Sequence, residues 1–308
     1  MSAIRYLLVG SLVATGVWFS YLLWRQWRGA GEDGDSGRRT PTVLECIVGF
    51  VTNFFDTLGI GSFAPTTAIF RLARMVPDEA IPGTLNVGHA VPSIAEGVIF
   101  IAAVSVDPVL LAVTLAASCA GAWLGAGVVV RLSRRLIQIG MGVALAGAAV
   151  LFAAVNLGLL PGGGDALGLS GWKFGAAAAA SFVFGALMTI GVGNYAPVLI
   201  TLSLLGMNPI AAFPIMTGSS ALLMQVASLR FLRAKRLCLP VALGLTLGGI
   251  PGVIVAAYVV RSLPLAALRW LVCVAVTYVA ASMLRSAATQ HPGISSRSDR
   301  KSPGVRAA

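Results

Sequence analysis

The chain has 308 residues, of which 57% are apolar and only 11% charged, and its net charge is +11. Soluble proteins carry about a quarter charged residues, so this composition excludes a soluble domain of useful size and predicts an integral membrane protein. Helix-length apolar stretches favour spanning helices over the alternating strands of a membrane barrel. The arginines lie in short loops between apolar stretches, where membrane orientation explains them, so nucleic acid is not an expected partner.

The first apolar stretch, about Ile4 to Trp24, is long enough to span a bilayer and ends in aromatic and basic residues. It lacks a convincing small-x-small cleavage site, so we interpret residues 1–28 as an uncleaved transmembrane helix. A polar, Gly-rich linker at 29–42 follows it, and this composition predicts flexibility.

Eight further apolar segments follow. They cover residues 43–75 (broken), 81–104, 108–130, 134–158, 172–206 (broken), 209–230, 238–260 and 264–286. They form two repeats of four segments, 43–158 and 172–286, joined by a Gly-rich loop at 159–171. The Ser- and Arg-rich tail at 287–308 is predicted to be disordered.

Both broken segments contain the same unusual motif. Gly59-Ile60-Gly61-Ser62-Phe63-Ala64-Pro65 returns 132 residues later as Gly191-Val192-Gly193-Asn194-Tyr195-Ala196-Pro197. Each copy is followed at the same distance by a second proline, Pro82 and Pro214. Paired helix breaks at corresponding positions of two halves indicate the binding site of a transporter.

The distribution of Lys and Arg predicts how the broken segments run. If both segments cross the membrane, these residues divide 14 to 8 between its two sides; if each returns as a hairpin, they divide 18 to 4. Cytoplasmic loops are enriched in Lys and Arg, so the sharper division favours re-entrant hairpins. The same rule places the C-terminus in the cytoplasm and the protein in the plasma membrane, which in bacteria is the inner membrane.

The expected fold is an all-α polytopic membrane protein with two inverted repeats. Each repeat has a broken, re-entrant hairpin and three spanning helices, and one extra helix precedes them. Such repeats bring one hairpin tip from each face to the middle of the membrane, as in alternating-access carriers. Non-helical backbone at that depth must be buried in protein or line a wet cavity.

The two breaks supply groups that suit an anion. Glycine permits a tight reversal and close approach of a ligand to the backbone, and Ser62 and Asn194 are typical N-caps of the following half-helices. The first amides of a helix carry about half a positive charge, so two converging helix starts predict an anion site. The alternative is that the glycines only allow close helix packing, which we expect for the Gly-x3-Gly pairs at 121–125 and 248–252.

Polar residues open the next helix of each repeat. Pro82-Gly83-Thr84-Leu85-Asn86 aligns with Pro214-Ile215-Met216-Thr217-Gly218, which is followed by two serines. These side chains either face the cavity or bond back to the preceding helical turn. The predicted substrate-binding residues are Gly59, Gly61, Ser62, Thr84, Asn86, Gly191, Gly193, Asn194, Tyr195, Thr217, Ser219 and Ser220.

Three ionisable residues lie within or near membrane depth in the first repeat, and their counterparts in the second are uncharged. Charged groups at this depth are costly and mark function. We interpret Asp56 as the carrier of a coupling proton, with His89 as a relay and Glu96 as a group that pairs or stays protonated. The alternatives are a helix-end or hydrogen-bonding role for Asp56 and a packing role for His89.

The doubled glycine breaks, each followed by a Thr-containing helix start, resemble the sulfite exporter TauE/SafE family of membrane transport proteins. The resemblance covers about residues 43–286. It implies transport of small sulfur-containing or organic anions, such as sulfite, sulfoacetate and sulfonates. It also implies that the site is lined by Gly59, Gly61, Ser62 and Pro65 together with Gly191, Gly193, Asn194 and Pro197. Members often have a third glycine where this chain has Ser62 and Asn194.

We therefore expect a secondary transporter of a small anion, sulfite or an organosulfonate, that works by alternating access, with proton coupling as an option. An anion channel is one alternative. An intramembrane enzyme is another, since Gly162-Gly163-Gly164-Asp165 resembles a protease motif, although it lacks a second aspartate. The sequence has neither an ATP-binding nor a zinc-binding motif, and its four cysteines have no ligand spacing, so we expect no metal or cofactor. The expected partners are the anion and the lipid bilayer, and a homo-oligomer is a further option.

Overall fold

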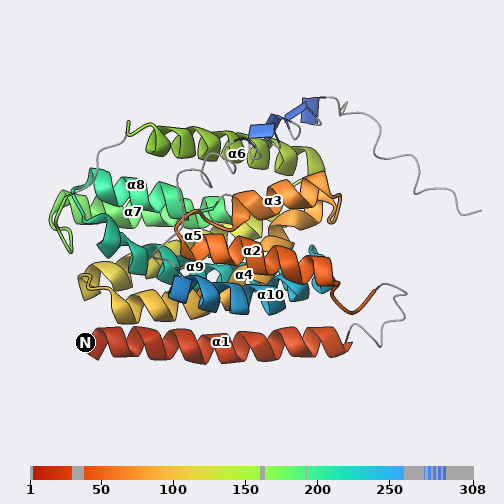
Figure 1. Ribbon diagram of the computed structural model, residues 1–308, viewed down its shortest axis with the longest axis horizontal. Coiled ribbons are helices and arrows are strands. Elements are labelled where there is room, and N and C mark those ends of the chain that lie inside the picture. Colours follow the sequence, from red (N-terminus) through yellow and green to blue (C-terminus); the bar gives the residue numbers. More distant parts are fainter. Residues whose placement is uncertain are drawn as a thin grey trace, which may run out of the picture.

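The computed structural model describes residues 3–29, 38–159, 164–191 and 193–259, with scattered positions between 274 and 288. Most of the predicted last segment and tail, and part of the linker, lie outside the described residues. The described chain is helical apart from one isolated β-bridge (Figure 1). Its elements are α1 (Ala3–Gly29), α2 (Val43–Thr57), α3 (Phe63–Leu72), the 3-10 turn η1 (Asp78–Ala80), α4 (Ile81–Ala103), α5 (Pro108–Val129), α6 (Arg134–Asn156), α7 (Trp172–Met188), α8 (Tyr195–Leu204), α9 (Pro209–Arg233) and α10 (Leu239–Val259).

Five stretches of helix are long and apolar enough to cross a membrane, namely α1, η1 with α4, α5, α9 and α10. This count refers to the described residues, and it confirms the prediction of a multi-pass membrane protein. The two broken segments each form a pair of shorter helices, α2 with α3 and α7 with α8. The other described helices, α1 included, begin and end within a few residues of the predicted segments.

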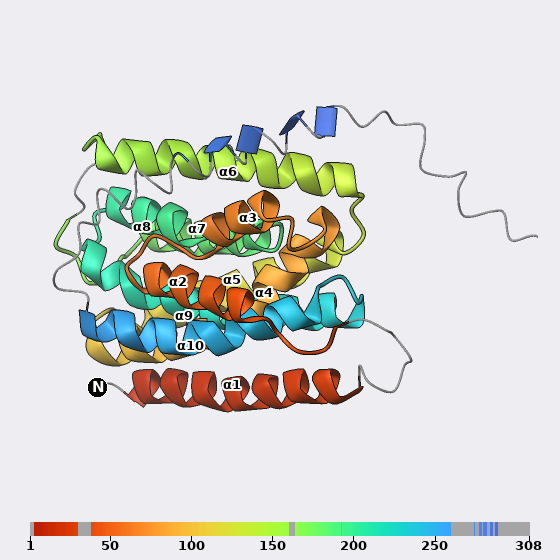
Figure 2. The same cartoon turned by 45° about the vertical axis from the view of Figure 1, so that its right-hand side comes forward.

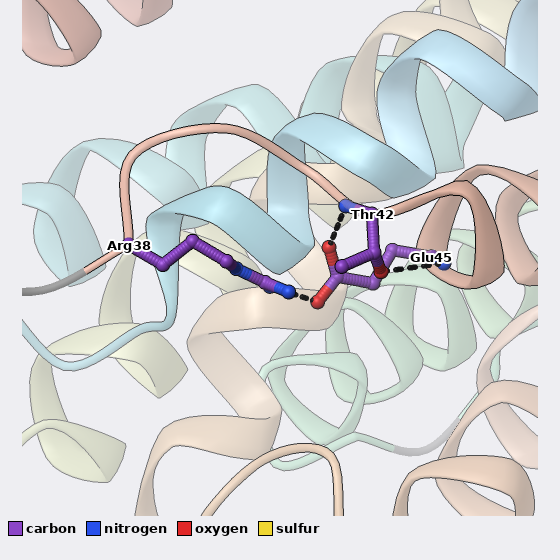
Figure 3. Close-up of polar contacts among 3 residues, drawn as sticks. All are labelled: Arg38, Thr42 and Glu45. Atoms are coloured by element: carbon purple, nitrogen blue, oxygen red, sulfur yellow. Dashed lines mark hydrogen bonds and ion pairs between the residues drawn. The ribbon is translucent and has the colours of Figure 1, made fainter.

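Local sequence explains where several helices begin. Thr42 and Glu45 form a capping box at the start of α2, in which the Thr42 amide donates to Glu45 Oε2 at 2.7 Å and the Thr42 hydroxyl accepts from the Glu45 amide (Figure 3). Arg38 pairs with the other oxygen of Glu45. Asp107 caps α5 by accepting from the Leu110 amide at 2.7 Å. These caps satisfy backbone donors that would otherwise lack a partner.

The helices lie in layers that share one long direction (Figure 1). In Figures 1 and 2, α6 forms one outer layer and α1 the opposite one, and the other helices lie between them. The centre of the molecule is the packing of α4 against α9, with α10 beside α4 and α5 beside α9.

The first helix is held against the central helices by polar contacts. The Arg5 guanidinium donates to the carbonyl oxygens of Ile101 and Val104 at the end of α4. Gln225 of α9 donates to the Thr15 hydroxyl at 3.3 Å. These bonds satisfy polar groups that cannot bond to water at membrane depth.

Each hairpin packs along a spanning helix of the other repeat, α2 along α10 and α7 along α5. Glycines allow the close approach, because a Cβ at Gly121 would overlap the Phe182 carbonyl and a Cβ at Gly248 would overlap the Cys46 carbonyl. The packing role predicted for the Gly-x3-Gly pairs is therefore confirmed.

A Gly248→Val substitution tests this interface. We expect the free energy of unfolding to fall by about 1–3 kcal/mol, because the added side-chain atoms meet backbone that cannot move aside. The matched control is Gly10→Val on α1, where a Cβ would meet nothing within 4 Å. Thermal unfolding in detergent should show a clear loss of stability for the first variant only; equal melting of both would contradict this packing.

The two hairpins have their outer ends at different ends of the bundle. Glu45, early in α2, lies against Gly244 near the start of α10, while Arg71 in the last turn of α3 bonds to Asp78 at 2.6 Å. These residues lie where α9 ends and α10 begins. By contrast, the loops flanking α7 and α8 meet through the Ala166–Met207 bridge, next to the start of α9.

Pro92 interrupts the backbone bonding of α4, because proline has no amide to bond the carbonyl of Gly88. Thr246 of α10 takes over this role and donates to the Gly88 oxygen at 2.9 Å. Helices in a membrane tolerate proline when a neighbouring side chain satisfies the freed carbonyl in this way. The bond also fixes α10 beside α4, and α10 in turn packs along α2.

Candidate functional site

The pair α2 and α3 forms the first hairpin, and the pair α7 and α8 forms the second. Their tips, which we define as the motif copies that begin at Gly59 and Gly191, touch each other. A Cβ added to Gly61 would lie 3.8 Å from the Cβ of Tyr195, and one added to Gly193 would lie 3.7 Å from the Cβ of Phe63. The contact is reciprocal, because Gly193 and Tyr195 follow Gly61 and Phe63 by the repeat distance of 132 residues. The duplicated motif therefore brings its two copies together in one place.

The reversals depend on glycine at three positions. Gly59, Gly61 and Gly191 have φ angles of 82°, 89° and 106°. Side chains other than hydrogen are strained in this region. Val192 lies outside the described residues. Both hairpins thus change direction through backbone that only glycine adopts readily.

A half-helix starts directly after each reversal, but its side-chain cap is missing. Ser62 and Asn194 occupy the N-cap positions as predicted, yet neither side chain forms a capping hydrogen bond. Their backbones are helical, with φ −85° and −88°, whereas a capping residue normally has an extended backbone. The capping role predicted for these two side chains is therefore wrong. Pro65 and Pro197 fall in the first turns, where a missing amide breaks no helical bond.

The second tip is joined to α4 and α9 by two buried hydrogen bonds. The Tyr195 hydroxyl donates to Glu96 Oε2 at 2.7 Å, and the Ser220 hydroxyl donates to Asn194 Oδ1 at 2.9 Å. Two polar atoms in the same group, Glu96 Oε1 and Asn194 Nδ2, have no protein partner, and Ser219 Oγ, in the residue before Ser220, has none either. Such atoms are costly when buried, so the site has bonding capacity left for a ligand.

Asp56 lies at the end of α2, next to the first tip, and is completely buried. Ser62 faces its carboxyl group, but neither carboxyl oxygen forms a hydrogen bond of good geometry. Its electrostatic neighbours include Glu96 and Tyr195. Two carboxyl groups from different helices therefore belong to one cluster at the meeting point of the tips.

His89 bridges α2 and α3 next to the first tip. Asn53 Nδ2 donates to the Gly49 carbonyl at 2.7 Å, so Asn53 Oδ1 is left to accept from His89 Nδ1 at 3.1 Å. His89 Nε2 lies 3.0 Å from Thr66 Oγ1, which is also 2.7 Å from the Ser62 carbonyl. The Thr66 hydroxyl donates to a neutral imidazole, or accepts from a protonated one and donates to Ser62 instead.

The sequence profile of the sulfite exporter TauE/SafE family matches residues 1–152 and 173–308. The chain belongs to this family. The match includes α1 and the tail, so it extends beyond the region in which sequence motifs alone carried the resemblance. No curated protein and no solved structure is significantly similar to the chain. Family membership and the apolar helices agree on an integral membrane transport protein.

In this TauE/SafE protein, three of the predicted polar residues bond within their own helix. The Thr84, Asn86 and Thr217 side chains each donate to a carbonyl four residues earlier, at 2.8 Å. Thr84 also accepts from the Cys238 amide at 2.9 Å and so ties α4 to the start of α10. The structure brings Ser220 to the second tip but leaves the Thr84 hydroxyl with two protein partners.

Sequence reasoning missed several residues that shape this site. Asn53 and Thr66 hold His89, and neither was singled out in the apolar segments. Their signal is weak but real, since both are polar residues within apolar helices next to a glycine break. Phe213 was also missed, although its ring lies 3.3 Å from the Cβ position of Gly59.

The ion pairs of this TauE/SafE protein lie away from the hairpin tips. In the described parts of the chain, Arg38 pairs with Glu45 and Arg71 pairs with Asp78, both near the outer ends of the first hairpin. Within those same parts, no group of three or more His, Cys, Asp or Glu side chains is arranged to hold a metal ion. The tip cluster therefore offers hydrogen-bond donors and carboxyl groups to a ligand.

Proposed function

We propose that this TauE/SafE family member is a secondary transporter of a small anion, sulfite or an organosulfonate, that works by alternating access. The observation that carries the proposal is the reciprocal contact between the tips, Gly61 with Tyr195 and Gly193 with Phe63. A single site made by corresponding parts of two repeats is the arrangement expected when each repeat opens the site to one side.

The packing supports an inverted relation between the repeats. The first hairpin packs on α10 and the second on α5, so hairpin and spanning helix exchange roles between the repeats. The outer ends of the hairpins lie at different ends of α9, as the distribution of Lys and Arg also predicts. Two re-entrant hairpins that approach from opposite faces fit both observations.

Donor groups at the tips support an anion as the substrate. Two helices of ten residues, α3 and α8, start at the tips without a side-chain cap, and helix starts attract negative charge. The unpartnered Nδ2 of Asn194 adds a neutral donor at the second tip. An anion can be bound here without a buried arginine.

The geometry favours a carrier over a channel or an enzyme. Direct contact between the tips fits a protein that closes around its substrate, whereas a channel needs one continuous open path. For an intramembrane protease, Asp165 would have to meet a second aspartate, but it lies in the loop before α7 and Asp56 lies at the tips.

Proton coupling would use the ionisable residues of the first repeat. Asp56 and Glu96 lie in one buried cluster, and buried ionisable groups within a membrane mark ion or proton pathways. The hydrogen bonds of His89 suit both of its protonation states, which fits a relay next to Asp56.

A binding screen followed by flux measurements tests the proposed function. Purified full-length protein is titrated with sulfite, sulfate, methanesulfonate and acetate, and reconstituted vesicles are then assayed for uptake. We expect saturable binding of sulfite or the sulfonate, and accumulation that collapses with the proton gradient. Passive flux that ignores the gradient would defeat the carrier proposal, and binding of none of the four anions would defeat the anion site.

A further inference from the structure

The tip cluster consists of Asp56, Glu96, Asn194, Tyr195 and Ser220. It combines groups that attract an anion with groups that repel one when ionised. Asn194 Nδ2 and Ser219 Oγ are buried donors without a partner, and they suit a negatively charged ligand. Glu96 Oε1 is a buried carboxyl oxygen without a partner, and neither oxygen of Asp56, which Ser62 faces, forms a hydrogen bond of good geometry. Asn194 bonds to Ser220, which lies beside the Tyr195 hydroxyl, and this hydroxyl bonds to Glu96. Asn194 and the carboxyl group of Glu96 therefore belong to one continuous cluster, which Asp56 joins through its electrostatic interaction with Glu96.

No cation among the described residues balances these carboxyl groups. The titratable groups that interact here are Asp56 on α2, Glu96 on α4 and Tyr195 on α8, while His89 on α4 bonds to Asn53 and Thr66 next to the first tip. The residue before α3 and the helices α6 and α9 contribute uncharged side chains at the tips: Ser62, Met141 and Ser220. An anion placed beside ionised carboxylates would be repelled strongly, because water screens little at this depth. Protonation removes the repulsion and also turns each carboxyl group into a hydrogen-bond donor.

We propose that this protein is a proton–anion symporter, in which Asp56 and Glu96 take up at least one proton when the anion binds and release it with the anion on the other side. The inference rests on the proposed transport of a small anion and adds the sign of its coupling to protons. No covalent bond forms or breaks; the proton passes from water to a carboxylate oxygen and back to water. Under an inward proton gradient, such a carrier takes its anion up.

Tyr195 is the positioning residue that makes the second hairpin sensitive to this proton. Its hydroxyl donates to Glu96, so the bond is strongest when Glu96 is ionised. The equivalent residues of the other repeat are Phe63 and Ser228, which cannot form such a bond. Ionised Glu96 therefore holds the second tip in place, and proton uptake loosens it. The first hairpin lacks this tyrosine–carboxyl bond and is tied to α4 by His89 instead.

The direction of proton movement tests the inference. The full-length protein is reconstituted into vesicles that contain a pH indicator, with the membrane potential clamped by potassium and valinomycin. Methanesulfonate is added outside, because this anion stays ionised near neutral pH and carries no proton itself. Labelled sulfite is assayed in parallel vesicles as a second substrate.

Symport predicts that the vesicle interior becomes more acidic as methanesulfonate enters. An interior that becomes more alkaline, or uptake without any pH change, would overturn the symport inference while leaving anion transport intact. A requirement for sodium in place of protons would overturn it too. Uptake of neither methanesulfonate nor sulfite would overturn the proposed function and this inference with it.

Two substitutions separate a coupling role from a structural one. Glu96→Gln cannot release a proton, so net accumulation should fall at least about tenfold more than exchange of internal for external anion. Tyr195→Phe should shift the pH profile of transport, whereas Tyr21→Phe on the exposed face of α1 should not. Equal loss of accumulation and exchange in Glu96→Gln, with an unshifted profile in Tyr195→Phe, would contradict these roles.

Discussion

Replacing Gly61 by leucine is expected to reduce transport by at least about a hundredfold, because a small displacement at a binding site has effects of this size. Gly61 has a φ of 89°, which strains any other side chain, and its Cβ position faces Tyr195 of the opposite tip at 3.8 Å. Leucine would therefore strain the first reversal and push the two tips apart. Uptake into vesicles measures the loss, and chromatography of the purified variant measures folding.

The matched control is Gly158→Leu, in the segment after α6. Gly158 also has a positive φ, 66°, but a Cβ there would meet nothing within 4 Å. This variant carries similar backbone strain without disturbing the tips, so its transport should stay within about threefold of the unaltered protein. Similar transport by both variants would show that contact between the tips does not matter.

The second large effect is expected from Asp56→Asn, which removes one carboxyl group from the tip cluster. If anion binding requires protonated carboxyl groups, transport by the unaltered protein rises as pH falls, by at most about tenfold per pH unit for one proton. The amide cannot ionise or repel the anion, so transport by the variant should vary much less with pH. Uptake measured across a pH series gives both profiles.

A fitting control for this series is Asp107→Asn, because asparagine also caps helices well and Asp107 caps α5 away from the tips. Its pH profile should match that of the unaltered protein. If Asp56→Asn keeps the full pH dependence, Asp56 does not carry the proton, and Glu96 alone would have to do so.

Sequence alone located the helix breaks well, because their causes are local. Glycines that permit left-handed backbone and prolines in the first helical turns leave a direct signal. The duplication also predicted that the two breaks lie together, and Gly61 does contact Tyr195. The close-packing glycines at 121–125 and 248–252 were also readable, since small residues at this spacing have a known effect in membranes.

The orientation of polar side chains was not predictable in the same way. Ser62 and Asn194 have the right chemistry for capping, but a helical backbone at the reversal turns their side chains away. Thr84 accepts from Cys238, whose position 154 residues later depends on how the helices pack. The bond between Tyr195 and Glu96 likewise joins residues 99 apart in the chain. No local pattern encodes such pairs.

Binding measured by titration calorimetry tests the central claim most directly, namely that both tips build a single anion site. The purified protein and the tip variants Gly61→Leu and Asn194→Ala, one for each hairpin, are titrated with the anion that binds best in the screen. We predict one bound anion per chain and loss of binding in either variant. Two anions per chain, or undiminished binding in either variant, would contradict a site shared between the repeats.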